Sequence, residues 1–245
     1  MQWHDEGIIL GTRRHGETSV ILETITARHG RHLGLVRGGR SRRMQAVLQA
    51  GNQVGLTWRA RLDEHLGTFQ AEPVALNAAR LFDSAVAIYG LQLLAAHLRL
   101  LPERDPHDGL YRTVKQVIDH LDEPQAAAEL LAQFEVLMLE ELGFGLELTS
   151  CAATGSAGDL AYVSPKSGRA VSRQAGAPWA DRMLALPAFL ISDEHGRADN
   201  EAIATAFAMT GHFFDRHVWM PRGTGEPAER AGFLAAVARA LKPTG

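Results

Sequence analysis

The sequence predicts an α+β protein, with a five-stranded OB-fold barrel in residues 1–76 followed by an α-helical domain in residues 77–245. Short runs rich in β-branched residues, separated by turns containing Gly, Asn or Asp, predict the barrel. Apolar residues at helical spacing predict the second domain. A polar, glycine-containing stretch at about residues 147–178 interrupts that spacing and predicts a short hairpin insertion.

Five short strands are expected in the first domain, at residues 7–11, 18–26, 32–37, 53–59 and 66–70. The fourth has the clearest alternation, because Val54, Leu56 and Trp58 share one face of the strand. We therefore place Trp58 in the core. A five-stranded barrel of this kind often binds oligonucleotides.

Helical periodicity begins at Asn77, and a first helix that is apolar on two neighbouring faces is predicted from about residue 81 to residue 100. The second helix carries a narrower apolar stripe, formed by Leu110, Val114, Val117 and Leu121. A third is expected from about residue 125 to residue 142, where Gly143 would end it.

The insertion has one strand-like piece, which contains Leu160, Tyr162 and Val163. Helical spacing then resumes. Asp199 or Asn200 can cap one further helix, and Pro227 suits the first turn of a last one.

Positive charge is concentrated in the first 80 residues, although the formal net charge of the chain is −3. That segment has eleven arginines and no lysine against seven acids, a balance of +4, whereas the remainder carries −7. Residues 28–43, RHGRHLGLVRGGRSRR, hold six of the arginines and no acid. Because arginine matches phosphate oxygens bidentately and glycine lets the backbone approach an anion, the expected partner is a polyanion. A solvated hairpin whose arginines only keep the protein soluble is the alternative.

The main phosphate contacts are expected where this run ends, at Arg37, Arg40, Arg42 and Arg43. A second set could line the same face: Arg13, Arg14, Arg28 and Arg31. Few aromatic residues are available in this domain to stack on bases. Binding should therefore depend on phosphates and read the base sequence poorly.

The sequence lacks the motifs of common enzymes. It has no G-x-x-x-x-G-K-[ST] and no G-x-G-x-x-G after a strand, and neither Ser41 nor Cys151 lies in a recognisable triad motif. His29 and His32 lie among arginines, which would repel a divalent cation. One cysteine, no secretion signal and no apolar run of about 20 residues favour a cytoplasmic protein without a membrane segment. We expect a non-enzymatic protein with no cofactor and no metal, although a catalytic site assembled only in three dimensions stays open.

Several motifs occur in order along the chain. They are an acid and an apolar strand at residues 6–10, Gly16 with Glu17, Thr26 with Gly30, the run VRGGRS at residues 36–41, and Leu48. In this order they resemble the start of the bacterial RecO family of recombination mediators. Residues 135–155, EVLMLEELGFGLELTSCAATG, are similar to the family's helix leading into a zinc-finger-like insertion.

The resemblance implies an OB barrel joined to a helical domain and a non-enzymatic role in DNA repair. Such proteins bind single- and double-stranded DNA, anneal complementary strands coated with single-strand binding protein SSB, and with RecR help to load RecA. The SSB contact implied by the family needs a cation beside a hydrophobic pocket, because the SSB tail is acidic with an apolar tip. Arg112 and Lys115 are candidates, since both lie off the buried stripe of their helix. An ordinary solvated helix face is the alternative reading of these two residues.

The chain departs from the zinc-binding members of that family. They have a C-x-x-C pair after the helix and a second pair after the hairpin. Here Thr154 stands at the fourth position of the first pattern, where the second cysteine would be, and Ser172 and Ala175 stand in place of the second pair. One thiolate cannot hold a structural zinc. We therefore expect the hairpin to fold without metal.

Two further functions are compatible with the same arginines. An OB-fold RNA-binding or ribosome-associated protein would depend on A-form geometry or on the 2′-hydroxyl. An adaptor would use the basic run to bind an acidic protein.

Overall fold

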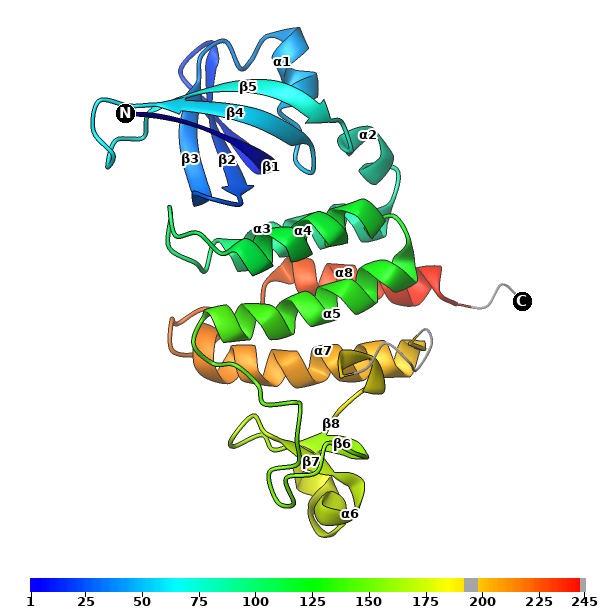
Figure 1. The fold of residues 1–245 in the computed structure, drawn as a ribbon. Coiled ribbons are helices and arrows are strands. Elements are labelled where there is room, and N and C mark those ends of the chain that lie inside the picture. The colour runs from blue at the N-terminus through cyan, green and yellow to red at the C-terminus, as the bar shows by residue number, and fades with distance from the viewer. Residues whose placement is uncertain (192–197, 243–245) are drawn as a thin grey trace. The chain divides into compact units, whose positions relative to one another are not determined.

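The computed structural model describes residues 1–191 and 198–242, and the chain divides into two compact units, residues 1–122 and 123–245. The first unit contains the barrel and helices α1 to α4, and the second contains the later helices and the insertion (Figure 1). No helix among the described residues is long and apolar enough to cross a membrane.

The first unit begins with a closed five-stranded barrel, in the order β1-β2-β3-β5-β4. The strands are β1 Gln2–His15, β2 Ser19–Thr26, β3 Gly30–Val36, β4 Gln53–Arg59 and β5 Thr68–Ala75. Strand β1 closes the barrel, because its first half pairs with β4 and its second half pairs with β2. A register shift between Ile9 and Gly11 bends this strand. The predicted OB-fold is confirmed, and β4 has the bounds that its alternation predicts.

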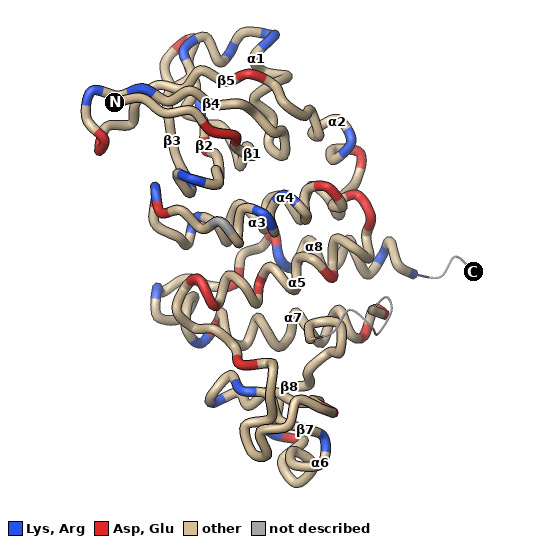
Figure 2. Tube along the Cα trace, viewed as in Figure 1, with Lys and Arg blue, Asp and Glu red and all other residues tan. Residues whose placement is uncertain are grey.

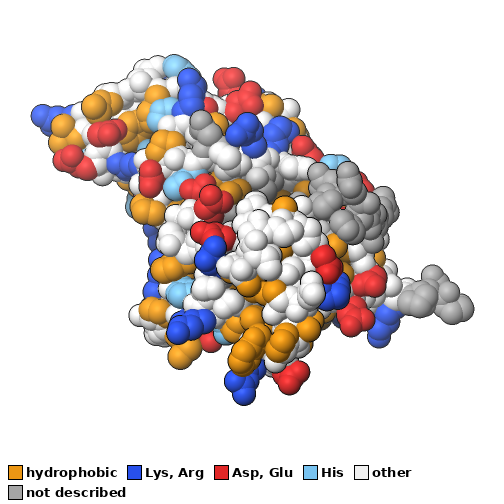
Figure 3. All heavy atoms as spheres, turned by 60° about the horizontal axis from the view of Figure 1, so that its bottom comes forward, with side chains coloured by type: hydrophobic (Ala, Val, Ile, Leu, Met, Phe, Trp, Pro, Cys, Tyr) orange, Lys and Arg blue, Asp and Glu red, His pale blue; other side chains and the backbone are white. Residues whose placement is uncertain are grey.

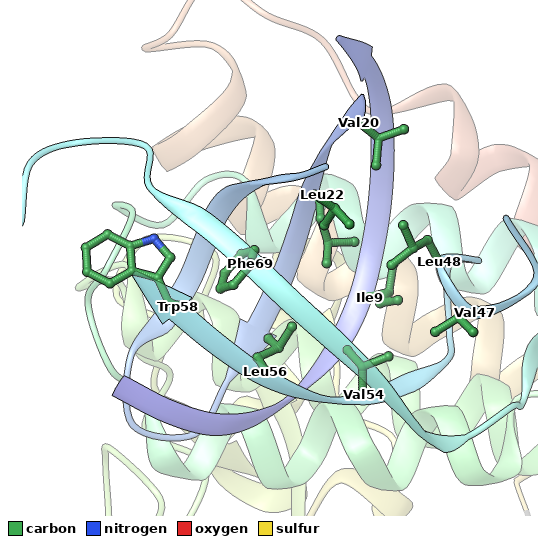
Figure 4. Close-up of a cluster of buried hydrophobic side chains, with 10 residues drawn as sticks. Ile9, Val20, Leu22, Val47, Leu48, Val54, Leu56, Trp58 and Phe69 are labelled. Atoms are coloured by element: carbon green, nitrogen blue, oxygen red, sulfur yellow. The ribbon is translucent and has the colours of Figure 1, made fainter. Parts of the chain in front are cut away.

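The barrel core is apolar and includes the alternating residues of β4. Val54 and Trp58 are fully buried and Leu56 is nearly so, packed with residues such as Leu22 and Phe69 (Figure 4). The indole nitrogen of Trp58 donates to the Leu66 carbonyl oxygen over 3.1 Å, which satisfies its one polar group. The prediction that Trp58 belongs to the core is confirmed.

A short helix, α1 Arg42–Val47, lies between β3 and β4. Ser41 caps it, because its hydroxyl accepts a hydrogen bond from the Met44 amide. The sequence pattern did not predict this helix, since six residues are too few to show a helical period.

Three helices complete the first unit: α2 Ala78–Leu81, α3 Ala85–Leu98 and α4 Asp108–His120. The helix predicted at residues 81–100 corresponds to α3, but it begins about four residues later than expected, because α2 ends at Leu81 and α3 starts only after the Ser84 cap. The Ser84 hydroxyl accepts from the Ala87 amide and begins α3. The predicted stripe of α4 is confirmed, since Leu110, Val114, Val117 and Leu121 are all buried.

The second unit contains α5 Pro124–Glu141, α7 Asn200–Phe214 and α8 Ala228–Ala240. Gly143, at φ +86°, follows α5, and the Asp199 carboxylate caps α7 by accepting from the Ala202 amide. A π-helical turn, Asp215–Trp219, continues α7. These starts and stops agree with the sequence pattern.

A buried ion pair joins these three helices. The Arg230 Nε of α8 lies 2.8 Å from the Glu135 Oε1 of α5, and their side chains are 5% and 0% exposed. The same guanidinium donates to the Phe207 carbonyl and to the Thr210 hydroxyl of α7. Aromatic rings of Phe207 and Trp219 lie against it. The charge is therefore well compensated where it is buried.

The insertion folds as a small three-stranded sheet rather than a simple hairpin. Its strands are β6 Leu160–Val163, β7 Ala170–Ser172 and β8 Leu184–Ala185, in the order β7-β6-β8. The short helix α6 Arg173–Gly176 and two 3₁₀ turns, Ala177–Arg182 and Ala188–Leu190, complete it. The strand-like piece recognised in the sequence is β6, but the third strand, of only two residues, has no detectable pattern.

Candidate nucleic-acid interface

Strand pairing brings six of the eight candidate arginines to one end of the barrel. Arg13 and Arg14 end β1 opposite Ile21 and Val20, and Val20 in turn pairs with Val36, the last residue of β3. Arg37 follows Val36 directly, and the loop then enters α1. We call the six residues at this end the basic lip: Arg13, Arg14, Arg37, Arg40, Arg42 and Arg43. In Figure 2 blue marks α1 and the chain leading into it.

Arg40 holds two segments of the basic lip together. Its Nη1 donates to the carbonyl oxygens of Gly16 and Glu17 in the β1–β2 turn. Its backbone amide donates to the Thr18 carbonyl oxygen over 3.0 Å. Arg40 therefore positions the loop that precedes α1 against the β1–β2 turn, so it is a positioning residue as well as a candidate contact. Sequence reasoning missed that the β1–β2 turn accepts hydrogen bonds from Arg40. Pairing β1 with β2 as a hairpin would have placed Gly16 at the same end of the barrel as the arginine-rich loop.

Glycine is required where this loop passes the barrel. Gly38 has a φ of +67°, a conformation that residues with a Cβ rarely adopt. A Cβ on Gly39 would lie 2.6 Å from the Val20 side chain. The pair thus lets the loop lie close to the barrel end, with a hollow of about 120 Å³ that Arg14 and Arg40 line.

The other five arginines of the basic lip carry uncompensated charge. All five are exposed, and within the described part of the chain none forms an ion pair with a carboxylate: Arg13, Arg14, Arg37, Arg42 and Arg43. Over the described residues of the face drawn in Figure 3, by contrast, positive and negative side chains are interspersed. A cluster of unpaired arginines creates a local positive potential in a chain of net negative charge.

Arg28 and Arg31 do not lie with the basic lip. Arg28 lies in the turn after β2, and Arg31 lies near the start of β3, both at the opposite end of the barrel. The eight residues of β2 separate the two ends by roughly 23 Å. Arg28 pairs with Asp5 and donates to the His4 carbonyl oxygen, while Arg31, 12% exposed, pairs with Glu23. Both arginines thus lie at the other end of the barrel, Arg31 held in a largely buried ion pair and Arg28 still 68% exposed, and the expectation that both could line the same face as the others is corrected.

The aromatic residues of the barrel are unavailable for stacking on bases. Trp58 and Phe69 are buried. Trp3 is half-buried, with the His29 ring stacked 4.0 Å from one face and Trp58 packed at 5.7 Å. His32 lies in the same cluster, where burial lowers its pKa to about 4 and keeps it neutral. The arrangement suits contacts to phosphates without readout of bases.

Arg112 and Lys115 lie exposed on α4. The Lys115 Nζ is 3.3 Å from the Asp119 Oδ2, one helical turn away, and both side chains are about half exposed. Such exposed pairs contribute little to stability, so Lys115 remains accessible to another acidic group.

The insertion is closed by hydrogen bonds around Cys151. Its buried Sγ accepts from the Ser172 amide over 3.2 Å and lies 3.5 Å from the Ser172 hydroxyl oxygen. Hydrogen bonds from Ser172 and Thr154 lower the pKa of this thiol to about 6. Cys151 and Ser172, two of the residues expected at the positions of zinc ligands, thus contact each other directly.

We expect purified protein, dialysed without chelator, to hold much less than one equivalent of zinc. One thiolate with two hydroxyl groups is a poor set of ligands for this metal. Metal analysis by mass spectrometry would check this, with the variant T154C/S172C/A175C as a positive control expected to retain about one equivalent. Stoichiometric zinc in the parent protein would contradict the expectation.

Comparison with known proteins covers nearly the whole chain. Residues 1–77 match the family described as Recombination protein O N terminal, and residues 79–225 match Recombination protein O C terminal. The chain is 68% identical to the DNA repair protein RecO of Chelativorans sp. (strain BNC1) over 241 residues, which are 98% of this chain and 97% of that protein. It is 69% identical to the protein of the same name from Mesorhizobium japonicum over 237 residues, covering 97% and 94%. For Brucella abortus (strain 2308) the identity is 63% over 242 residues, 98% of each chain.

Proposed function

Because this chain belongs to the RecO family of DNA repair proteins, we propose that its basic lip binds the phosphate backbone of single- and double-stranded DNA and promotes annealing of complementary strands. The observation that carries this proposal is the group of five exposed arginines without carboxylate partners, among the described residues, at one end of the barrel. The role is non-enzymatic and cytoplasmic.

Phosphate contacts alone can support annealing. Two single strands repel each other through their phosphates, and arginines bound to both strands lower that repulsion and release counterions. Since the side chains of the basic lip do not occupy base edges, those edges stay free to pair. Formation of the duplex supplies the free energy, so no nucleotide hydrolysis is needed.

The family also supports a set of protein partners. We propose that the protein acts on DNA coated with SSB and, together with RecR, assists the loading of RecA. Contact with RecA would be indirect. The acidic tail of SSB is proposed to bind near Arg112 and Lys115, whose exposed positive charge suits it.

The R112A/K115A variant is expected to bind an SSB tail peptide on the order of tenfold more weakly than the parent, because two attractive charges are removed. Fluorescence anisotropy of a labelled peptide would measure this. D119N is the matched control, since it frees Lys115 from its ion pair and should bind the peptide at least as tightly as the parent. Equal affinity of R112A/K115A and parent would remove these residues from the proposal.

The function is tested by annealing of complementary oligonucleotides coated with SSB across a salt series. The proposal requires faster annealing than with SSB alone, with the acceleration disappearing as salt rises. Absence of any acceleration would contradict it. Tighter binding to matched RNA duplexes than to DNA would instead favour an RNA-binding protein.

A further inference from the structure

The outer face of the barrel has a pocket beside the basic lip. It lies across β1, β2 and β3, where Gly11 pairs with Glu23 and Glu23 pairs with Leu33. Its volume is about 250 Å³, and Thr12 lines both this pocket and the smaller hollow of the basic lip. The two cavities are therefore neighbours, and we call the larger one the outer pocket.

The floor of the outer pocket is apolar and open. Ile21 and Leu33 project from neighbouring strands to the outer face, where Ile21 is 8% exposed and Leu33 is half-buried. Gly11 adds no side chain, although a Cβ there would meet only the Arg99 Nη2, at 3.6 Å. The register shift before Gly11 does not require glycine either, because its φ lies outside the left-handed region. Glycine inside a strand often marks a place where another molecule approaches closely.

Two arginines border this floor. Arg13 lies on the same face of β1 as Gly11, with the two Cα atoms about 7 Å apart, and it has no ion-pair partner within the described part of the chain. Arg99 follows the last residue of α3, and its guanidinium approaches over Gly11. One guanidinium therefore lies near each end of the segment from Gly11 to Arg13.

Glu23, the acid in the outer pocket, is compensated. It is 14% exposed and accepts from the Arg99 Nε and Nη2, over 3.0 and 2.8 Å, and from the Arg31 Nη1 over 3.1 Å. Arg31 also lies 3.9 Å from Glu103, so three guanidinium groups, counting Arg13, face two carboxylates. Among the described residues the Arg99 Nη1 has no hydrogen-bond partner, and Arg99 is half exposed. This nitrogen can donate to a bound molecule while Arg99 stays on Glu23.

We propose that the outer pocket receives one unpaired base of a DNA strand whose phosphates are bound by the basic lip, an inference that rests on the proposed function. A small anion alone would leave Ile21 and Leu33 uncovered, whereas a base has a flat apolar face that covers them. The phosphate beside that base can reach Arg13, and the Arg99 Nη1 can donate to an acceptor of the same nucleotide. Because the aliphatic floor forms no hydrogen bonds, it accepts any base.

The neighbouring hollow of the basic lip favours a nucleic acid as the occupant. Two arginines line each cavity, Arg14 and Arg40 in the hollow and Arg13 and Arg99 in the outer pocket. Successive cavities of this kind fit a chain that carries an anionic group on every unit, as the phosphates of DNA do. A base can enter the outer pocket only when it is unpaired. The outer pocket therefore adds affinity for single strands, whereas a duplex uses the basic lip alone.

The test compares the affinity of the full chain for an oligothymidylate, for an abasic strand of equal length and for a duplex, by fluorescence anisotropy. The parent should bind the oligothymidylate on the order of fivefold more tightly than the abasic strand, because apolar surface of a base is buried. G11V fills the outer pocket with a residue that favours strands. It should bind the oligothymidylate only as tightly as the abasic strand, with an unchanged salt slope, since no phosphate contact is lost. Its affinity for the abasic strand and for the duplex should equal that of the parent.

G55V is the matched control, because it places the same residue in β4, where a Cβ would meet no atom closer than 3.9 Å. It should keep the fivefold preference. If G11V does not fold, L33T decides, since it removes part of the apolar floor and should lower the preference in the same way. Equal affinity of the parent for the two single strands, or a preference that persists in G11V, would overturn the proposed base pocket and leave the basic lip intact. Failure of the parent to bind either strand would instead contradict the proposed function itself.

Discussion

The R42E/R43E variant is expected to bind an oligothymidylate on the order of 100-fold more weakly than the parent at about 0.1 M salt, because two phosphate-binding cations are replaced by two repulsive charges. Both residues begin α1, are exposed and have no carboxylate partner within the described part of the chain. The slope of log affinity against log salt should also become shallower by about 1.4, which is 0.7 for each phosphate that is no longer neutralised. Fluorescence anisotropy across a salt series measures both quantities.

A matched control distinguishes loss of DNA contacts at the basic lip from a general effect of net charge on DNA affinity. R182E/R222E changes the same number of charges at exposed positions of the second unit. It should lower affinity only slightly and leave the salt slope unchanged. If both double variants weaken binding equally, affinity follows net charge rather than the basic lip, and the proposed interface fails.

The R230A variant is expected to lower the free energy of unfolding by about 3–5 kcal/mol, the largest effect on stability that we predict. Removal of Arg230 leaves the Glu135 carboxylate fully buried without the cation that it faces. It also removes the donor to the Phe207 carbonyl of α7. Urea unfolding followed by circular dichroism would measure the change.

The double variant E135L/R230M is the control for this pair. Because it leaves no charge at these two buried positions and keeps much of the side-chain volume, it should be far more stable than R230A and within about 1–2 kcal/mol of the parent. A stability for R230A within about 1 kcal/mol of the parent would show that the buried pair does not join the three helices as described.

Local signals predicted much of the fold. The alternation of apolar residues predicted the bounds of β4 and the burial of Trp58. The capping residue Asp199 predicted the start of α7, and Gly143 predicted the end of α5. The break before Ser84 was missed, because apolar residues continue on both sides of it and outweigh one capping hydroxyl. The two-residue strand β8 was missed because it is defined only by its pairing with β6.

The candidate site was predictable only in part, since closeness in sequence is not closeness in space. Arg31 and Arg37 are six residues apart, yet β3 carries them to opposite ends of the barrel. Arg13 is distant in sequence from Arg42, but both lie at the end of the barrel where the β1–β2 turn contacts the loop before α1. The ion pair of Arg31 with Glu23 depends on strand pairing that no single-residue pattern reveals.

The salt dependence of oligothymidylate binding is the sharpest check on the proposal that five unpaired arginines of the basic lip bind phosphates without reading bases. We predict a slope of log affinity against log salt of about −3.5, the same within error for mixed-sequence strands of equal length. A slope near zero, or an affinity that changes strongly with base sequence at constant salt, would show that the basic lip does not bind DNA in this way.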